Sequence, residues 1–157
     1  MPSRRDQIRM SDDELRDFLA EQKVVTVATT GPNGRPHLMP LWYVLQPDGD
    51  LIGWTFAKSQ KARNLQRDPR ATLQVEDGVE YGELRGVMFE CDVEVEGDAA
   101  RVADCGMAIF QRYAPPGGEL PPEVREMVEK QAPKRIGMRF HPTRTVSWDH
   151  RKLGGTY

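Results

Sequence analysis

The sequence has only two cysteines, Cys91 and Cys105, and they do not form a CxxC pair. This leaves no basis for a disulfide framework or for a zinc site of the usual spacing. No apolar run is long enough to cross a bilayer, and no hydrophobic segment follows the basic start MPSRRDQIRM as it would in a signal peptide. We therefore expect a cytoplasmic protein without a metal site or a membrane segment, whose two thiols are reduced and serve in packing.

An excess of charge of either sign is also lacking. Lys+Arg 22 against Asp+Glu 24 gives a formal net charge of -2, so the chain has no overall attraction for nucleic acid or for an anionic membrane. A GxSxG motif is absent, and His37, His141 and His150 are scattered without metal-ligand spacing. Any anion site must therefore be local, and the sequence names no catalytic residue.

The chain begins with a marked helix and continues as strands. In MSDDELRDFLAEQ, Ser11 is the expected N-cap and Glu14 its capping-box partner. From Lys23 onward the runs KVVTVATT, RPHLMPLWYVL and LIGWTF are strand-like, and the turn sequences GPNG and QPDGD separate them. They predict a meander of three antiparallel strands. Pro36 and Pro40 place the second strand at an edge or a bulge of the sheet.

The second half of the chain adds more strands and two helices. ATLQVED predicts a fourth strand, and VMFECDVEVEG alternates apolar and polar residues over its whole length. DAARVADCGMAIFQRYA predicts a helix capped by Asp98, and Glu123–Gln131 predicts another. KRIGMRFHPTRTVSWDH predicts two last strands, bent at His141-Pro142. The pattern favours a single domain over residues 1–157, mainly β (α+β), with a closed or partly closed barrel of about six or seven mostly antiparallel strands and short helices.

A basic segment interrupts this series of strands. In TFAKSQKARNLQRDPRATL, Ser59 is the expected N-cap of a short helix, and Lys61 and Arg63 lie beside its first unpaired N–H groups. Two interpretations remain open. The segment is either a capped, solvated surface helix or a phosphate site, where helix dipole, unpaired donors, hydroxyl and cations act together.

Three blocks of the sequence follow one another in a familiar order. They are TVATTGPNGRPHLMPLWYV, DGDLIGWTFAKSQKARNLQRDPRATLQVED and YGELRGVMFECDVEVEGD, within roughly residues 11 to 98. In these blocks the chain resembles the split β-barrel flavin and deazaflavin binders related to pyridoxamine 5′-phosphate oxidase. The run KxRNLxxDPR in the second block is most similar to the actinobacterial branch that uses coenzyme F420.

The resemblance implies a fold of the FMN-binding split-barrel type and a homodimer with two cofactor sites at the subunit interface. The cofactor phosphate is then expected at Ser59 and Lys61, with Arg63 and Asn64 nearby. The ring system is expected along the second and third strands, at Met39, Pro40, Leu41, Thr55 and Phe56. The partner subunit is expected to close the site with C-terminal residues, for which Trp148 and Arg151 are the candidates.

The resemblance also implies a function. We expect an F420-dependent oxidoreductase that transfers a hydride from the reduced deazaflavin to an unsaturated or conjugated organic acceptor, a small molecule. Two alternatives stay open. One is an FMN enzyme of the pyridoxamine-phosphate oxidase type, although the C-terminal SWDHRKLGG departs from the substrate signature of a vitamin-B6 oxidase. The other is a carrier that holds F420 or haem without turnover, since no proton donor is evident.

Overall fold

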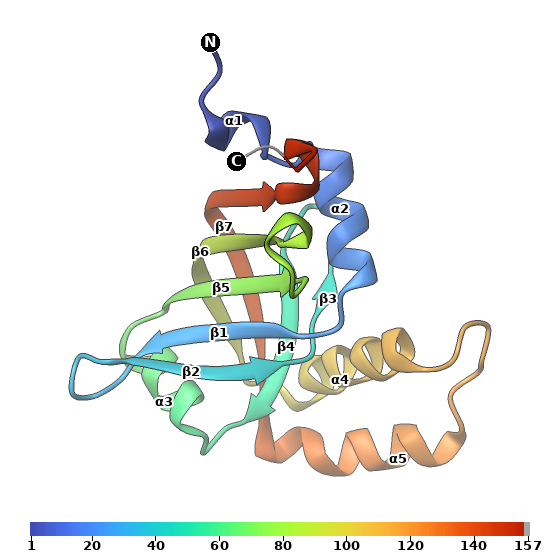
Figure 1. Cartoon of the computed structure of the whole chain (residues 1–157). Helices are drawn as coiled ribbons and strands as arrows, with labels where there is room; N and C mark the ends of the chain where they lie inside the picture. Colours follow the sequence, from blue (N-terminus) through green and yellow to red (C-terminus); the bar gives the residue numbers. More distant parts are fainter. Residues whose placement is uncertain (156–157) are drawn as a thin grey trace.

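Alternating buried and exposed side chains build the sheet, as the sequence predicts. They alternate in β5 (Arg70–Asp77) and through the centre of β6 (Arg85–Glu96). The computed structural model describes residues 1–155, whose seven strands pair antiparallel in the order β2-β1-β5-β6-β7-β4-β3. The sheet curls into a split barrel (Figure 1), which confirms the expected fold class. The other strands are β1 (Val25–Thr30), β2 (Pro36–Leu41), β3 (Val44–Leu45), β4 (Leu51–Phe56) and β7 (Arg135–Asp149).

Short helices surround the sheet. Ser11 caps α2 as predicted, because its Oγ accepts from the Glu14 N–H at 3.2 Å and its own N–H donates to the Glu14 carboxylate at 2.7 Å. Within residues 1–155, no helix has the length and apolarity needed to cross a membrane. The α-helices are α1 (Arg4–Gln7), α2 (Asp12–Glu21), α3 (Gln60–Arg67), α4 (Ala99–Tyr113) and α5 (Pro122–Gln131). The 3₁₀ turns are η1 (Tyr81–Glu83), η2 (Ala132–Lys134) and η3 (His150–Leu153).

The opening of the barrel lies between β2 and β4. After β2 the chain passes through Trp42 and Tyr43 and re-enters the sheet as β3, which pairs with Leu51 and Ile52 at the start of β4. β2 pairs with β1 alone, and residues 53–56 of β4 pair with β7 alone, within the part of the chain that the structure describes. β2 begins beside α3, and β4 leads into it (Figure 1). Two strand edges and one helix therefore frame the opening.

The last strand differs from the prediction. Two strands bent at His141-Pro142 were expected, but β7 is one continuous strand that pairs with β6 along its length. The register shifts between Glu90 and Cys91, so that Cys91 lies opposite Pro142 while Glu90 lies opposite Arg144. A bulge of this kind absorbs one extra residue and tolerates a proline, so the strand bends without ending.

Two apolar clusters hold the fold together. The larger fills the barrel and includes Phe18, Tyr43, Leu73, Phe89 and Phe140. The smaller lies between β4 and the α4–α5 hairpin, and it is organised around the indole of Trp54. Gly106 of α4 allows this approach, because an added Cβ would lie 2.6 Å from that indole. The outer side of β4 is thus covered by helices, while its inner side faces the opening.

Candidate functional site

The start of α3 lies directly after the end of β4. A turn closed by the Ser59 N–H and the Phe56 carbonyl, 3.0 Å apart, links the strand to the helix. Ser59 is the N-cap, as predicted, and its Oγ accepts from the Ala62 N–H at 3.2 Å. The other amides of the first turn have no partner inside the helix, and the positive end of the helix dipole lies here. Local sequence thus produces an anion-compatible helix start at the barrel opening.

Lys61 is the unexpected feature of this helix. Its side chain is buried, with 6% exposure, and its Nζ donates to the Thr55 hydroxyl at 3.3 Å. Among residues 1–155 it forms no ion pair with a carboxylate, and burial lowers the pKa of its ammonium group. Buried lysines are rare without a paired charge, because a desolvated ammonium is costly.

Thr55 joins the helix start to the strand. It is 7% exposed, and its Oγ1 lies 3.4 Å from the Ser59 Oγ. Thr55, Ser59 and Lys61 therefore form one polar group, which we call the Thr55–Ser59–Lys61 cluster. It brings together two hydroxyls, one ammonium group and the first amides of α3. All three residues belong to the set that the sequence predicts for cofactor binding.

The other two predicted residues of α3 occupy different surroundings. Asn64 is fully buried; its amide donates to the Thr29 hydroxyl at 3.0 Å and accepts from Gln60 at 2.8 Å. The bond to Thr29 fixes α3 against β1, and the bond from Gln60 lies within the helix. Asn64 therefore positions α3 and has no exposed surface to offer. Arg63 is exposed on the same helix. A flexible, exposed guanidinium remains available to an approaching anion.

The predicted residues of β2 lie at the open edge. Met39 is opposite Val27, so its side chain points to the same side of the sheet as that core residue, yet it is 44% exposed. Leu41 crosses the opening, because a Cβ added at Gly53 would lie 2.7 Å from its Cδ2. Pro40 is exposed between them and removes one backbone donor from the strand. The edge is apolar and incompletely covered.

Phe56 ends β4 with a half-exposed ring that carries a cation on one face. The guanidinium of Arg135 lies 3.9 Å from the centre of that ring and 4.2 Å from the ring of Trp54. Burial lowers the pKa of this guanidinium, which stays protonated. Sequence reasoning missed Arg135, because only the pairing of β4 with β7 brings it opposite Phe56.

His37 is a second residue that the structure adds. It lies opposite Thr29 in the β1–β2 register, hence on the side of the sheet that faces α3. Its Nδ1 is buried and has no hydrogen-bond partner within residues 1–155. Buried polar atoms of this kind are uncommon and are usually satisfied by a bound molecule or water. The sequence gives no signal for this position, because His37 is one of three scattered histidines.

Trp148 and Arg151 lie away from the cluster. Trp148 is opposite Gly86 in the β6–β7 pair, and its indole covers that glycine. Arg151 lies in the C-terminal turn η3 and forms a 2.7 Å ion pair with Asp149. Figure 1 shows this end of β7 and α3 at opposite ends of the barrel. Within one chain, Trp148 and Arg151 therefore lie far from the start of α3.

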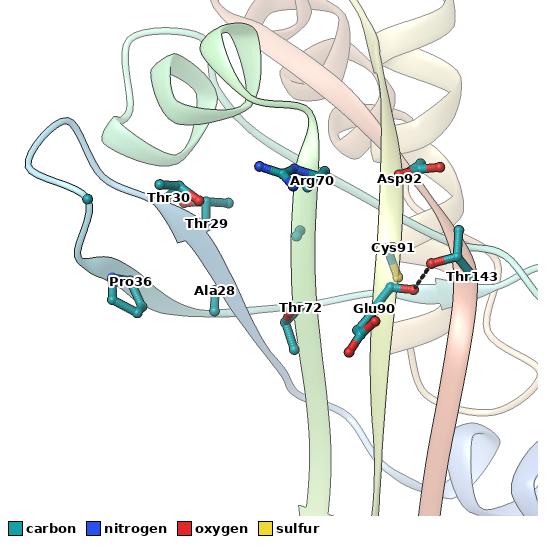
Figure 2. Close-up of a pocket in the computed structure, with 12 residues that line it drawn as sticks. Ala28, Thr29, Thr30, Pro36, Arg70, Thr72, Glu90, Cys91, Asp92 and Thr143 are labelled. Atoms are coloured by element: carbon teal, nitrogen blue, oxygen red, sulfur yellow. Dashed lines mark hydrogen bonds between the residues drawn. The ribbon is translucent and has the colours of Figure 1, made fainter.

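A separate hollow of about 550 Å³ lies on the outer face of the sheet. Figure 2 shows its polar side chains, including Arg70, Thr72 and Glu90, across β5 and β6. The guanidinium of Arg70 is engaged by Asp68 at 2.8 Å. Cys91 contributes to the lining, but burial raises the pKa of its thiol to about 12, so it is not nucleophilic at neutral pH. None of the predicted cofactor residues lines this hollow.

Comparison with known proteins places this geometry in a family. The family model described as pyridoxamine 5′-phosphate oxidase matches residues 11–149. A conserved hypothetical protein of Mycobacterium tuberculosis is 42% identical, with a TM-score of 0.86 over 99% of this chain and 95% of that one.

More distant solved structures share the fold alone. One described as an F420 reductase is 21% identical, with a TM-score of 0.63 over 83% of this chain and 94% of that one. The haem storage protein HutZ from Vibrio cholerae is 17% identical, with a TM-score of 0.67 over 87% of this chain and 94% of its own. Proteins with this fold are therefore described with different ligands, so the fold alone does not identify the ligand.

Proposed function

This chain belongs to the pyridoxamine 5′-phosphate oxidase family, and on that basis we propose that it is an oxidoreductase that binds a phosphorylated flavin or deazaflavin. Coenzyme F420 is the first candidate. When bound, a reduced deazaflavin supplies a hydride, here to an unsaturated or conjugated organic acceptor.

The observation that carries the proposal is the buried ammonium of Lys61. It lies at the start of a helix, contacts only a hydroxyl, and lacks a carboxylate counter-charge among the residues that the structure describes. A phosphate group would supply the missing negative charge and would accept from the Ser59 hydroxyl and the first amides of α3. Arg63, exposed on the same helix, would add a second cation.

The edges of β2 and β4 fit the ring system of such a coenzyme. Met39 and Leu41 offer apolar surface, and the backbone of residues 53–56 has no second strand partner within residues 1–155. Free backbone groups can bond the polar edge of a planar ring while the apolar side chains cover its face. Pro40 would lie beside the ring, and the buried Nδ1 of His37 is the candidate for one further hydrogen bond.

We further propose that the protein acts as a homodimer. Trp148 and Arg151 lie at the far end of the barrel from α3, so they would reach a cofactor only if a second copy presented them. The exposed apolar side chains at the opening would support such an association, because Leu38 is 58% exposed and Trp42 is 47% exposed.

Absorption spectra of titrations with F420, FMN and haemin separate the candidate ligands. We expect F420 to bind with a dissociation constant of about 10 µM or lower and FMN to bind more weakly. Tight binding of FMN without binding of F420 would favour the FMN enzyme. Reduced F420 should then be consumed when enones, quinones or tetrapyrroles are added. Binding without consumption across that panel would favour a carrier.

A further inference from the structure

Three arginines converge on a pocket at the other end of the molecule from α3. Arg5, Arg9 and Arg144 line a cavity of about 290 Å³ together with residues 145–147 of β7. Arg5 belongs to α1, Arg9 to the segment after it, and Arg144 to the sheet. Figure 1 shows α1 beside the end of β7, well away from α3. Within one chain, this pocket is therefore separate from the Thr55–Ser59–Lys61 cluster.

Backbone contacts fix the segment that carries Arg9. The Ile8 carbonyl accepts from the Asp149 N–H at 2.7 Å, and the Met10 N–H donates to the Ser147 hydroxyl at 3.0 Å. The ammonium of Lys152 donates to the Arg9 carbonyl at 2.7 Å. None of these contacts uses the guanidinium of Arg9. The N-terminal segment is thus held on β7 while the side chain is left to line the pocket.

The cations of this pocket are only partly neutralised. Arg144 pairs with Glu90 at 3.0 Å through Nη1, and Arg9 lies 4.0 Å from Asp6. Asp6 itself accepts from the Ser3 hydroxyl at 2.6 Å, so its carboxylate is shared. Among the described residues, 1–155, no acidic residue lines the pocket. In a chain whose net charge is -2, this is a local concentration of positive charge.

We propose that this pocket binds a small polyanion that carries two or more carboxylate or phosphate groups. Guanidinium groups bind both kinds of anion through paired N–H donors, and three of them around one cavity favour a ligand with several acidic groups over one with a single charge. The volume lies at the lower end of the range of ligand pockets, which fits a molecule of the size of citrate or pyrophosphate.

The test is isothermal titration calorimetry of the full chain with citrate and with pyrophosphate, in low salt. Arg144→Gln, Arg5→Gln and Arg9→Gln should each weaken binding about tenfold, and Arg144→Lys should restore part of the affinity, because the charge remains while the paired donors are lost. Arg4→Gln is the matched control, since Arg4 lies in the same helix but does not line the pocket. It should bind like the unaltered protein.

Each outcome decides the proposal. Binding of citrate alone assigns the site to polycarboxylates, and binding of pyrophosphate alone assigns it to phosphates. The proposal fails if neither ligand binds with a dissociation constant of about 1 mM or lower, which is a binding free energy of about -4 kcal/mol. It fails as well if Arg4→Gln weakens binding as much as Arg144→Gln does. It also fails if Lys61→Met abolishes binding while Arg144→Gln preserves it, because the anion would then occupy the proposed cofactor site.

Discussion

Replacing Lys61 with methionine separates a binding role of this lysine from a structural one. Methionine keeps a long unbranched side chain in the buried position and removes the charge. Among residues 1–155 the Lys61 ammonium donates one hydrogen bond, to Thr55 at 3.3 Å, and burial lowers its pKa, so the charge is poorly compensated in the folded chain. Removing an uncompensated buried charge is expected to stabilise the ligand-free protein by about 1 kcal/mol, or about 2–4 °C in Tm for a chain of this size.

The same change should weaken coenzyme binding. One charge-assisted contact to a phosphate is worth about 1.5–3 kcal/mol, so affinity for F420 should fall roughly 10- to 150-fold. Chemical denaturation measures the first effect, and fluorescence titration with F420 measures the second. Lys58→Met is the matched control, because Lys58 is exposed just before the helix. It should leave stability within about 0.5 kcal/mol and should change affinity much less than Lys61→Met does.

The pH dependence of unfolding tests independently whether the Lys61 charge destabilises the folded protein. Because the folded-state pKa of Lys61 is below its ordinary value, the stability cost of its charge is fully present at pH values below the folded-state pKa. The cost declines as pH rises through that pKa toward the ordinary value. The stability advantage of Lys61→Met should shrink in the same window. A loss of stability at neutral pH together with unchanged affinity for F420 would refute the reasoning.

Three further predictions concern other parts of the chain. Ser59→Ala should lower the free energy of unfolding by about 1 kcal/mol and should also weaken F420 binding. Ser11→Ala, which removes the cap of α2, should lower stability by a similar amount and leave F420 binding unchanged. Chemical denaturation measures stability, and titration with F420 measures binding. Gly106→Ala places a Cβ 2.6 Å from an indole and should destabilise by about 1–3 kcal/mol. At Gly97 an added Cβ would meet no atom within 4 Å in residues 1–155 apart from its chain neighbours, so Gly97→Ala should be nearly neutral in the same denaturation assay. The thiol of Cys91, whose pKa is raised to about 12, should react with a disulfide reagent at pH 8 much more slowly in the native protein than in denaturant; equal rates would contradict its burial.

Elements with strong local signals could be predicted from the sequence. The helix of residues 60–67 begins after Ser59, as predicted, and Asp68-Pro69 follows its end. Asp98 caps α4 as expected, through a 3.1 Å bond from the Arg101 N–H. These signals lie within a few residues of the boundary that they define, so no tertiary information is needed.

Features that depend on distant contacts were missed. The break between β2 and β3 contains Tyr43, whose buried hydroxyl donates to the Leu19 carbonyl at 2.6 Å. The bulge opposite Glu90 keeps β7 continuous where the proline indicated two strands. The burial of Lys61 was also not predicted, because a basic helix alone is typical of a solvated face. Each depends on the packing of segments that are remote in the sequence.

A crystal structure of the protein with bound coenzyme F420 tests the central claim most directly. We predict a phosphate oxygen within about 3 Å of the Lys61 Nζ, with others accepting from the Ser59 hydroxyl and the first amides of α3. A phosphate bound elsewhere, with the Lys61 ammonium still contacting only Thr55, would contradict the account.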